Sequence, residues 1–147
     1  MEQAKKQLHT AAFVVLLFAG LSLLQVIGEL LFGELNTAQI PEGSPDNILL
    51  ITKMILFGVS LVALLPKFYV GIKGLRIAKN PTPSKRHIIW ATIIFVCSLL
   101  CLIDPAAALV KQGDVFENLS AFGSILLEVL VYHDYIKCAK MVANLAE

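Results

Sequence analysis

The feature of this sequence that most constrains its fold is a series of four long apolar segments separated by short polar stretches. The segments cover approximately residues 8–35, 46–79, 85–103 and 115–143. An α-helix needs about 20 residues to cross the hydrocarbon core of a bilayer, and each segment is close to that length or longer. The pattern predicts an all-α fold: a four-helix transmembrane bundle built from two helical hairpins.

The overall composition indicates that lipid forms part of the solvent around this chain. Of its 147 residues, 57% are hydrophobic and 16% are charged, which leaves too few polar side chains to cover a water-soluble globule of this size. The length suits one unit, so residues 1–147 are predicted to form a single transmembrane domain. A formal net charge of +1 gives no reason to expect nucleic acid as a partner.

The residue types that usually carry chemistry do not form a recognisable motif. The three cysteines lack a CxxC pair, and the three histidines are not spaced as metal ligands. The sequence has no glycine-rich phosphate loop, no GxSxG and no HExxH. We therefore expect no cofactor, no metal and no enzymatic activity.

Proline and glycine mark the connections between the predicted helices. The first loop is expected at 36–47, where Ser44 and Pro45 suit the N-cap and first residue of the second helix. Two prolines within 80–84 separate the second helix from the third. The first apolar segment is too long for a cleavable signal peptide, so we expect it to remain as a membrane helix.

The outer end of the third helix has two interpretations. Asp104 and Pro105 either kink that helix or form the N-cap and first position of a short surface helix that ends near Gly113. We favour the surface helix, because residues 111–114 are too polar for hydrocarbon. Asp114 and Glu117 then resemble a capping box at the start of the fourth helix.

The distribution of basic residues predicts the orientation in the membrane. Ten Lys and Arg residues near the ends of the spans fall on one side, and only Lys53 and Lys111 fall on the other. Because cytoplasmic loops are enriched in Lys and Arg, both termini are predicted to be cytoplasmic. Four aromatic residues in that half are expected at the headgroup boundary: Tyr69, Trp90, Tyr132 and Tyr135.

Two short matches suggest an internal repeat. Residues 72–80 align with 136–144 at an offset of about 64, and 22–24 align with 98–100 at about 76. The chain can therefore be interpreted as two similar hairpins in tandem. The alternative is that apolar helices ending in Lys and Arg look alike by chance, and we favour this alternative.

Glu128 is the strongest candidate for a functional side chain within a span. It shares a helix face with Ser124, and Gln25, Ser60 and Ser98 are expected at a similar depth on the other helices. We expect no cation at that depth, so desolvation should favour the neutral carboxyl. Two roles remain open: a proton or cation site, or an interhelical hydrogen bond. We favour the second.

Two ion pairs are expected near the ends of the spans. Glu29 and Lys53 should lie at similar depth in the first hairpin, and Lys67 should lie near Asp134 at the cytoplasmic edge. His133 and Asp134 do not predict a catalytic dyad, because sequence neighbours on a helix point about 100° apart.

The run from Phe68 to Pro81 resembles the inner-loop signature of small, uncharacterised four-helix membrane proteins of Gram-positive bacteria. The matching residues are Phe68-Tyr69-Val70-Gly71-Ile72-Lys73-Gly74-Leu75-Arg76-Ile77-Ala78-Lys79-Asn80-Pro81. The resemblance implies a bacterial plasma (inner) membrane and no defined activity. It assigns no functional residue.

The sequence leaves two hypotheses for function. The first is an interaction or accessory subunit that forms a homo-oligomer or joins a larger membrane complex, with membrane lipids around it. The alternative is a small oligomeric channel or transporter whose pathway is lined by Glu128, Ser124 and Ser60. We favour the interaction subunit.

Overall fold

The computed structural model describes residues 2–32, 46–110 and 115–146, and all regular structure within them is α-helical. The helices are, in chain order, α1 (Glu2–Phe32), α2 (Asp46–Lys79), α3 (Arg86–Cys101), α4 (Ile103–Val110) and α5 (Val115–Ala146). Only Leu102 separates α3 from α4, so the two lie end to end as one rod. The prediction of an all-α chain with four long helical rods is confirmed.

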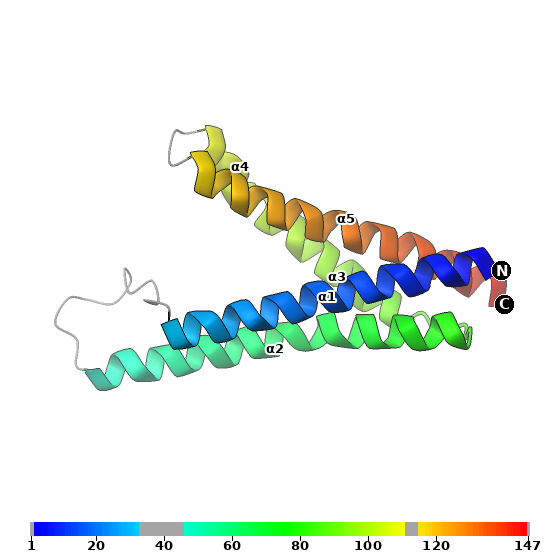
Figure 1. The fold of residues 1–147 in the computed structure, drawn as a ribbon, viewed down its shortest axis with the longest axis horizontal. Helices are drawn as coiled ribbons and strands as arrows, with labels where there is room; N and C mark the ends of the chain where they lie inside the picture. Colours follow the sequence, from blue (N-terminus) through cyan, green and yellow to red (C-terminus); the bar gives the residue numbers. More distant parts are fainter. Residues whose placement is uncertain (1, 33–45, 111–114, 147) are drawn as a thin grey trace.

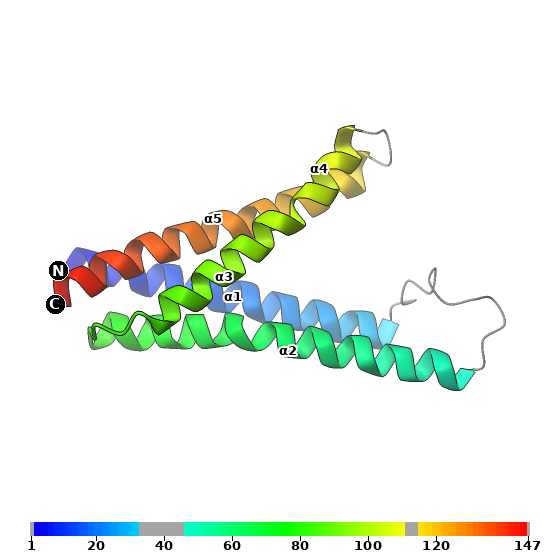
Figure 2. The same cartoon turned by 180° about the vertical axis from the view of Figure 1, so that it is seen from behind.

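The rods are arranged as two hairpins that meet at one end. Helices α1 and α2 form the first hairpin, and α5 packs against α3 and α4 to form the second (Figure 1). All four rods converge where both chain termini lie, and the hairpins splay apart towards the other end (Figures 1 and 2). The Lys- and Arg-rich ends of the helices are therefore gathered at the converged end.

Three helical segments are long and apolar enough to cross a membrane: Glu2–Leu31, Leu50–Lys79 and Arg86–Ala107. The bounds of α2 coincide with those expected, whereas α1 begins six residues earlier than the expected residue 8. Good helix formers explain the earlier start, since residues 2–7 include Glu, Gln, Ala and Lys. The expected cap residues Ser44, Pro45 and Asp114 lie outside the described residues.

A short helix is present at this point, as favoured, but Asp104 is not its N-cap. Asp104 is already the second residue of α4, and the amide of Ala106 donates to the carbonyl oxygen of Leu102 at 3.2 Å. Leu102 itself has α-helical dihedral angles and donates to Ser98. Helical hydrogen bonding thus continues across the join, and Pro105 is tolerated in the first turn of α4 because that turn needs few donors.

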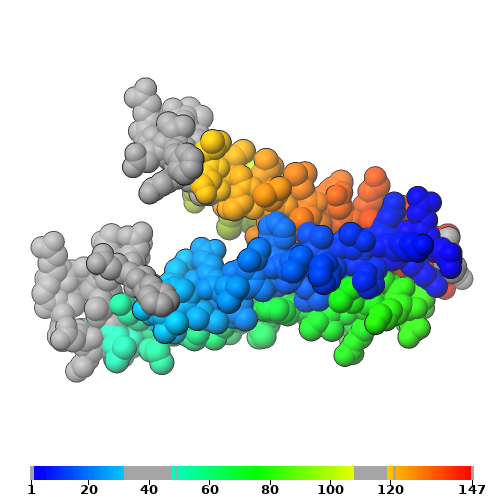
Figure 3. All heavy atoms as spheres, viewed as in Figure 1, coloured from blue at the N-terminus to red at the C-terminus, as the bar shows by residue number. Residues whose placement is uncertain are grey.

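The core lies in the converged half of the molecule. Buried apolar side chains extend no further than Ala19 in α1, and begin at Leu64 in α2 and Val129 in α5, among the side chains described. Beyond these positions many large apolar side chains are exposed, such as Leu24 and Leu127. Figure 3 shows the resulting notch between the two hairpins.

The burial pattern of the first hairpin recurs in the second. Four positions of α1 are buried and correspond to four of α3 that lie 79 positions later: Leu8, Ala12, Val15 and Ala19 against His87, Ala91, Ile94 and Ser98. Five of α2 correspond to five of α5 that lie 65 positions later: Leu64, Val70, Gly74, Ile77 and Ala78 against Val129, Tyr135, Ala139, Val142 and Ala143. The burial correspondence has offsets of 79 and 65, whereas the matches in residue type have offsets of about 76 and 64. The two repeats therefore differ in register by three residues and by one residue. A shift of one residue turns a helix by about 100°, so the two registers do not describe the same faces.

The closest helix contacts in the core depend on two glycines of α2. A Cβ on Gly74 would lie 2.6 Å from Cε2 of Tyr135 and 2.8 Å from Cβ of Ala12. A Cβ on Gly71 would lie 2.5 Å from Cγ of Leu16. Small residues let helix backbones approach in this way within membranes. Gly71 and Gly74 thus let α2 sit close to both α1 and α5.

Tyr135 completes this contact with a hydrogen bond. Its hydroxyl donates to the carbonyl oxygen of Val70 at 3.0 Å, and its ring is fully buried. Tyr132 is 1% exposed. Both rings therefore belong to the core, whereas Tyr69 and Trp90 are partly exposed. The position of all four rings at the headgroup boundary stays a prediction.

We expect Gly74→Ala to lower the free energy of unfolding by about 1–3 kcal/mol, because the added methyl group forces the Tyr135 ring to move. Gly58→Ala is the matched control in the same helix, since nothing lies within 4 Å of its added Cβ. The control should leave stability unchanged or raise it slightly. Thermal unfolding followed by circular dichroism in detergent micelles measures both, and equal effects would contradict the proposed close contact.

Candidate functional site

An ion pair joins the two hairpins near the limit of the core. Nζ of Lys67 in α2 lies 2.6 Å from Oε1 of Glu128 in α5. The two side chains are only 21% and 19% exposed, so each charge is largely shielded from solvent. A close pair of opposite charges offsets part of the desolvation that each would otherwise suffer.

Helical spacing explains why these two side chains face one another. Lys67 lies midway between Leu64 and Val70, which are both buried on the core face of α2. Glu128 precedes the buried Val129 and lies one helical turn before Tyr132. Both ionisable groups thus stand on core-facing sides of their helices, at the level where the hairpins begin to separate.

The expectation that Glu128 has no cation at its depth is wrong, as is the pairing of Lys67 with Asp134. Asp134 is 75% exposed, and its carboxylate lies 3.4 Å from Nδ1 of His133. Glu128 and Asp134 differ by six residues, which is about 9 Å along a helix. The long Lys67 side chain can span part of that difference, and the tilt of α5 against α2 sets which carboxylate it meets.

The other residues predicted to surround Glu128 lie on four different helices, and Ser124, one turn before it on α5, is the one that shares its helix. Ser98 is buried in α3, whereas Ser124 is exposed in α5. Gln25 donates from Nε2 to Oε1 of Glu29 at 3.0 Å within α1. Ser60 lines a cavity between α1 and α2 elsewhere. The predicted polar set is therefore distributed over several places, and Lys67 is the residue that it lacked.

Glu29 and Lys53 lie on opposite walls of that small cavity, whose volume is about 30 Å³. Their neighbouring positions agree with the antiparallel hairpin that the sequence predicts. The described residues nevertheless show no ion pair between them, and Glu29 accepts the Gln25 hydrogen bond instead.

His87 is a core residue that the sequence pattern alone had not indicated. His87 is 1% exposed, and its ring meets that of Tyr135 edge to face, with centroids 6.1 Å apart. Its spacing of four and seven residues from Ala91 and Ile94 is the signal that places it on the buried face of α3. Within residues 2–32, 46–110 and 115–146, no group of three His, Cys, Asp or Glu residues could hold a metal ion.

Comparison with known proteins gives no family for this chain: no family model, curated protein or solved structure matches it. The resemblance of residues 68–81 to small bacterial membrane proteins therefore stays a prediction. The site has to be interpreted from its own geometry, which is a largely buried charge pair across two helical hairpins.

We expect the Lys67–Glu128 pair to be energetically coupled. Glu128→Leu or Lys67→Met alone leaves one charge largely buried without its partner, which should lower the free energy of unfolding by about 1–3 kcal/mol. The double variant should be less destabilised than the sum of the singles, by about 1 kcal/mol or more. Reversible unfolding in detergent micelles tests this, with Lys53→Met as the control lysine.

Additive effects of the two substitutions would show that the charges do not interact in solution. A Lys53→Met effect as large as that of Lys67→Met would show that any lysine in α2 contributes equally. Either result would contradict the ion pair as a specific link between the hairpins.

Proposed function

We propose that the chain is a multi-pass protein of the plasma (inner) membrane with both termini on the cytoplasmic side. In each of the three segments that are long enough to span a bilayer, at most 22% of the residues in the most apolar stretch are buried within the protein. So many uncovered apolar side chains require lipid or another apolar partner around them. The Lys and Arg residues gathered at the converged end support a cytoplasmic position for that end.

Within the membrane, the protein acts as an interaction or accessory subunit and forms oligomers. The observation that carries this proposal is the notch between the splayed hairpins, whose helices have large exposed apolar side chains. A protomer whose core fills only one half of its length leaves room for helices of a partner in the other half. Helix packing in lipid depends on close van der Waals contact, which such a notch can provide.

The Lys67–Glu128 pair supports this proposal over conduction. A carboxylate with an ammonium 2.6 Å away binds a permeating cation only after that pair breaks. Ser60, which the conduction hypothesis also needs, lines the small cavity beside Glu29 and Lys53. The polar groups therefore stabilise the relative position of the hairpins in preference to forming a pathway.

Cysteine labelling in intact cells tests the orientation. In a background with the native cysteines replaced by serine, Thr82→Cys in the segment between α2 and α3 should be protected from a membrane-impermeant thiol reagent. Gln112→Cys should react, because the polar stretch 111–114 follows the outer end of the third span. Labelling of Thr82→Cys alone would indicate the opposite orientation. Labelling of both variants or of neither would also contradict the proposed topology.

Counting protomers in lipid nanodiscs tests the interaction proposal. We expect two or more copies per assembly when the full-length chain is diluted into excess lipid, with the same number for Glu128→Gln. Monomers at every dilution would contradict the proposed oligomer. Proton or cation flux in liposomes that is lost in Glu128→Gln would favour the channel instead.

A further inference from the structure

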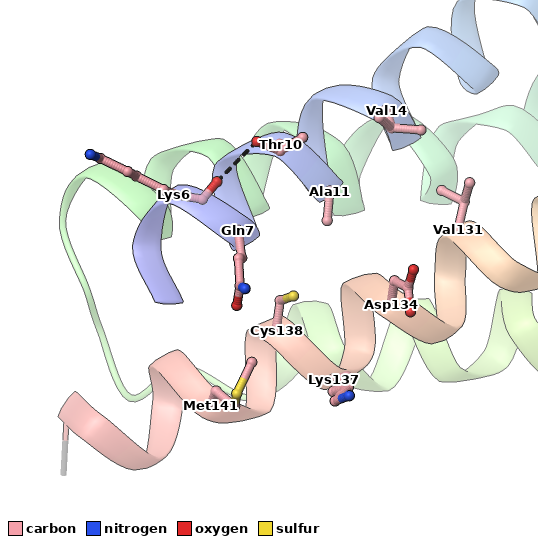
Figure 4. Close-up of a pocket in the computed structure, with 10 residues that line it drawn as sticks. All are labelled: Lys6, Gln7, Thr10, Ala11, Val14, Val131, Asp134, Lys137, Cys138 and Met141. Carbon is pink, nitrogen blue, oxygen red and sulfur yellow. Dashed lines mark hydrogen bonds between the residues drawn. The ribbon is translucent and has the colours of Figure 1, made fainter. Parts of the chain in front are cut away.

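A groove lies between α1 and α5 close to the converged end of the molecule, separate from the ion pair. Its volume is about 730 Å³, and residues of both helices line it (Figure 4). Small or short side chains such as Ala11 and Cys138 form its walls. The groove is therefore bounded by two helices that lie side by side without filling the space between them.

The groove combines an apolar wall with charges of both signs. Ala11, Val14 and Val131 supply apolar surface, and the Asp134 carboxylate stands on the α5 side (Figure 4). Lys6 and Lys137 lie at its edges. The Lys6 ammonium points away from the groove in Figure 4, and its long flexible side chain has to turn inward to reach a bound group. The formal charge of these three ionisable residues sums to one positive charge.

The structural repeat relates this groove to the interface between α2 and α3. In the burial register of the two hairpins, Ala11 of α1 corresponds to Trp90 of α3, and Asp134 of α5 corresponds to Tyr69 of α2. Two aromatic rings thus stand at the equivalent positions of the α2 and α3 pair. The α1 and α5 pair has instead a methyl group and a carboxylate, which leave space and charge for a ligand.

We propose that this groove binds a phospholipid whose headgroup has both a phosphate and a primary ammonium, as in phosphatidylethanolamine. The phosphate is held by Lys6 and Lys137, the ammonium is held by Asp134, and the first methylenes of an acyl chain lie against Ala11, Val14 and Val131. This inference rests on the proposed membrane location and does not depend on the interaction function. The groove lies near the helix ends that carry the basic residues, which is the depth of lipid headgroups in the proposed orientation.

The pattern of charges favours this headgroup over others. A headgroup with phosphate and no amine leaves the Asp134 carboxylate next to an anion. A choline headgroup has a cation, but its methylated nitrogen has no N–H to donate to a carboxylate. A soluble phosphate makes no use of the apolar wall.

Native mass spectrometry of the full-length chain in detergent micelles, titrated with defined lipids, tests the inference. Dioleoylphosphatidylethanolamine should bind about fivefold more tightly than dioleoylphosphatidylglycerol or dioleoylphosphatidylcholine. Asp134→Asn should remove that preference, and Lys137→Ala should weaken binding of all three lipids. Lys140→Ala is the matched control, since Lys140 is exposed on the same helix and does not line this groove.

Ala11→Trp provides a second, steric test, because it places in α1 the residue that stands at the equivalent position of α3. It should abolish lipid binding while the circular dichroism spectrum and thermal midpoint remain close to those of the native chain. If Ala11→Trp unfolds the protein, the Asp134→Asn and Lys137→Ala titrations decide whether the groove binds the lipid.

Equal binding of the three lipids by the native chain would overturn the headgroup assignment. Equal binding of water-soluble glycerophosphoethanolamine would overturn the role of the apolar wall. Loss of the lipid preference in Lys140→Ala would show that general surface charge is responsible. If cysteine labelling places the chain in the membrane and these titrations fail, only the lipid site is wrong.

Discussion

Three helices meet at Gly74, and this close contact holds α1, α2 and α5 together in the core. Tyr135 of α5 packs where a side chain on Gly74 would stand, and its hydroxyl bonds to the carbonyl oxygen of Val70 at 3.0 Å. Ala12 brings α1 to the same point. In lipid, where apolar side chains gain little by leaving their solvent, close packing and interhelical hydrogen bonds are the main forces that hold helices together. The core is therefore dense at this end.

The charge pair marks where this dense packing ends. Lys67 and Glu128 meet close to Leu64 and Val129, which are among the last buried residues before the hairpins separate. Each charge is costly to shield alone, so the pair stabilises one relative position of α2 and α5. Beyond it the helices expose large apolar side chains to their surroundings. The chain thus combines a packed converged half with a splayed half whose large apolar side chains are exposed, which is the basis of the proposed interaction.

The two hairpins share a pattern of burial but not of chemistry. The buried positions of α1 and α2 recur in α3 and α5, yet Trp90 and Tyr69 correspond to Ala11 and Asp134. Positions that correspond in the burial pattern therefore have partly exposed aromatic rings in one helix pair and groove-lining residues in the other. The proposed lipid site lies where the smaller Ala11 stands, because a small side chain leaves space between helices that a bulky one would occupy.

Local sequence pattern was sufficient for the helical content and for the three described segments that can cross a membrane. Long apolar runs and proline breaks act within a few residues along the chain, and this is why the bounds of α2 follow from the sequence. The order of the helices also predicted that Glu29 and Lys53 would come near one another. The contacts between helices did not follow in the same way. The sequence spacing predicted the wrong partner for Lys67, and it indicated no structural role for Gly71, Gly74 or His87. Those contacts depend on the rotation and tilt of each helix, which only the packed tertiary structure decides, because a turn of one residue moves a side chain by about 100°.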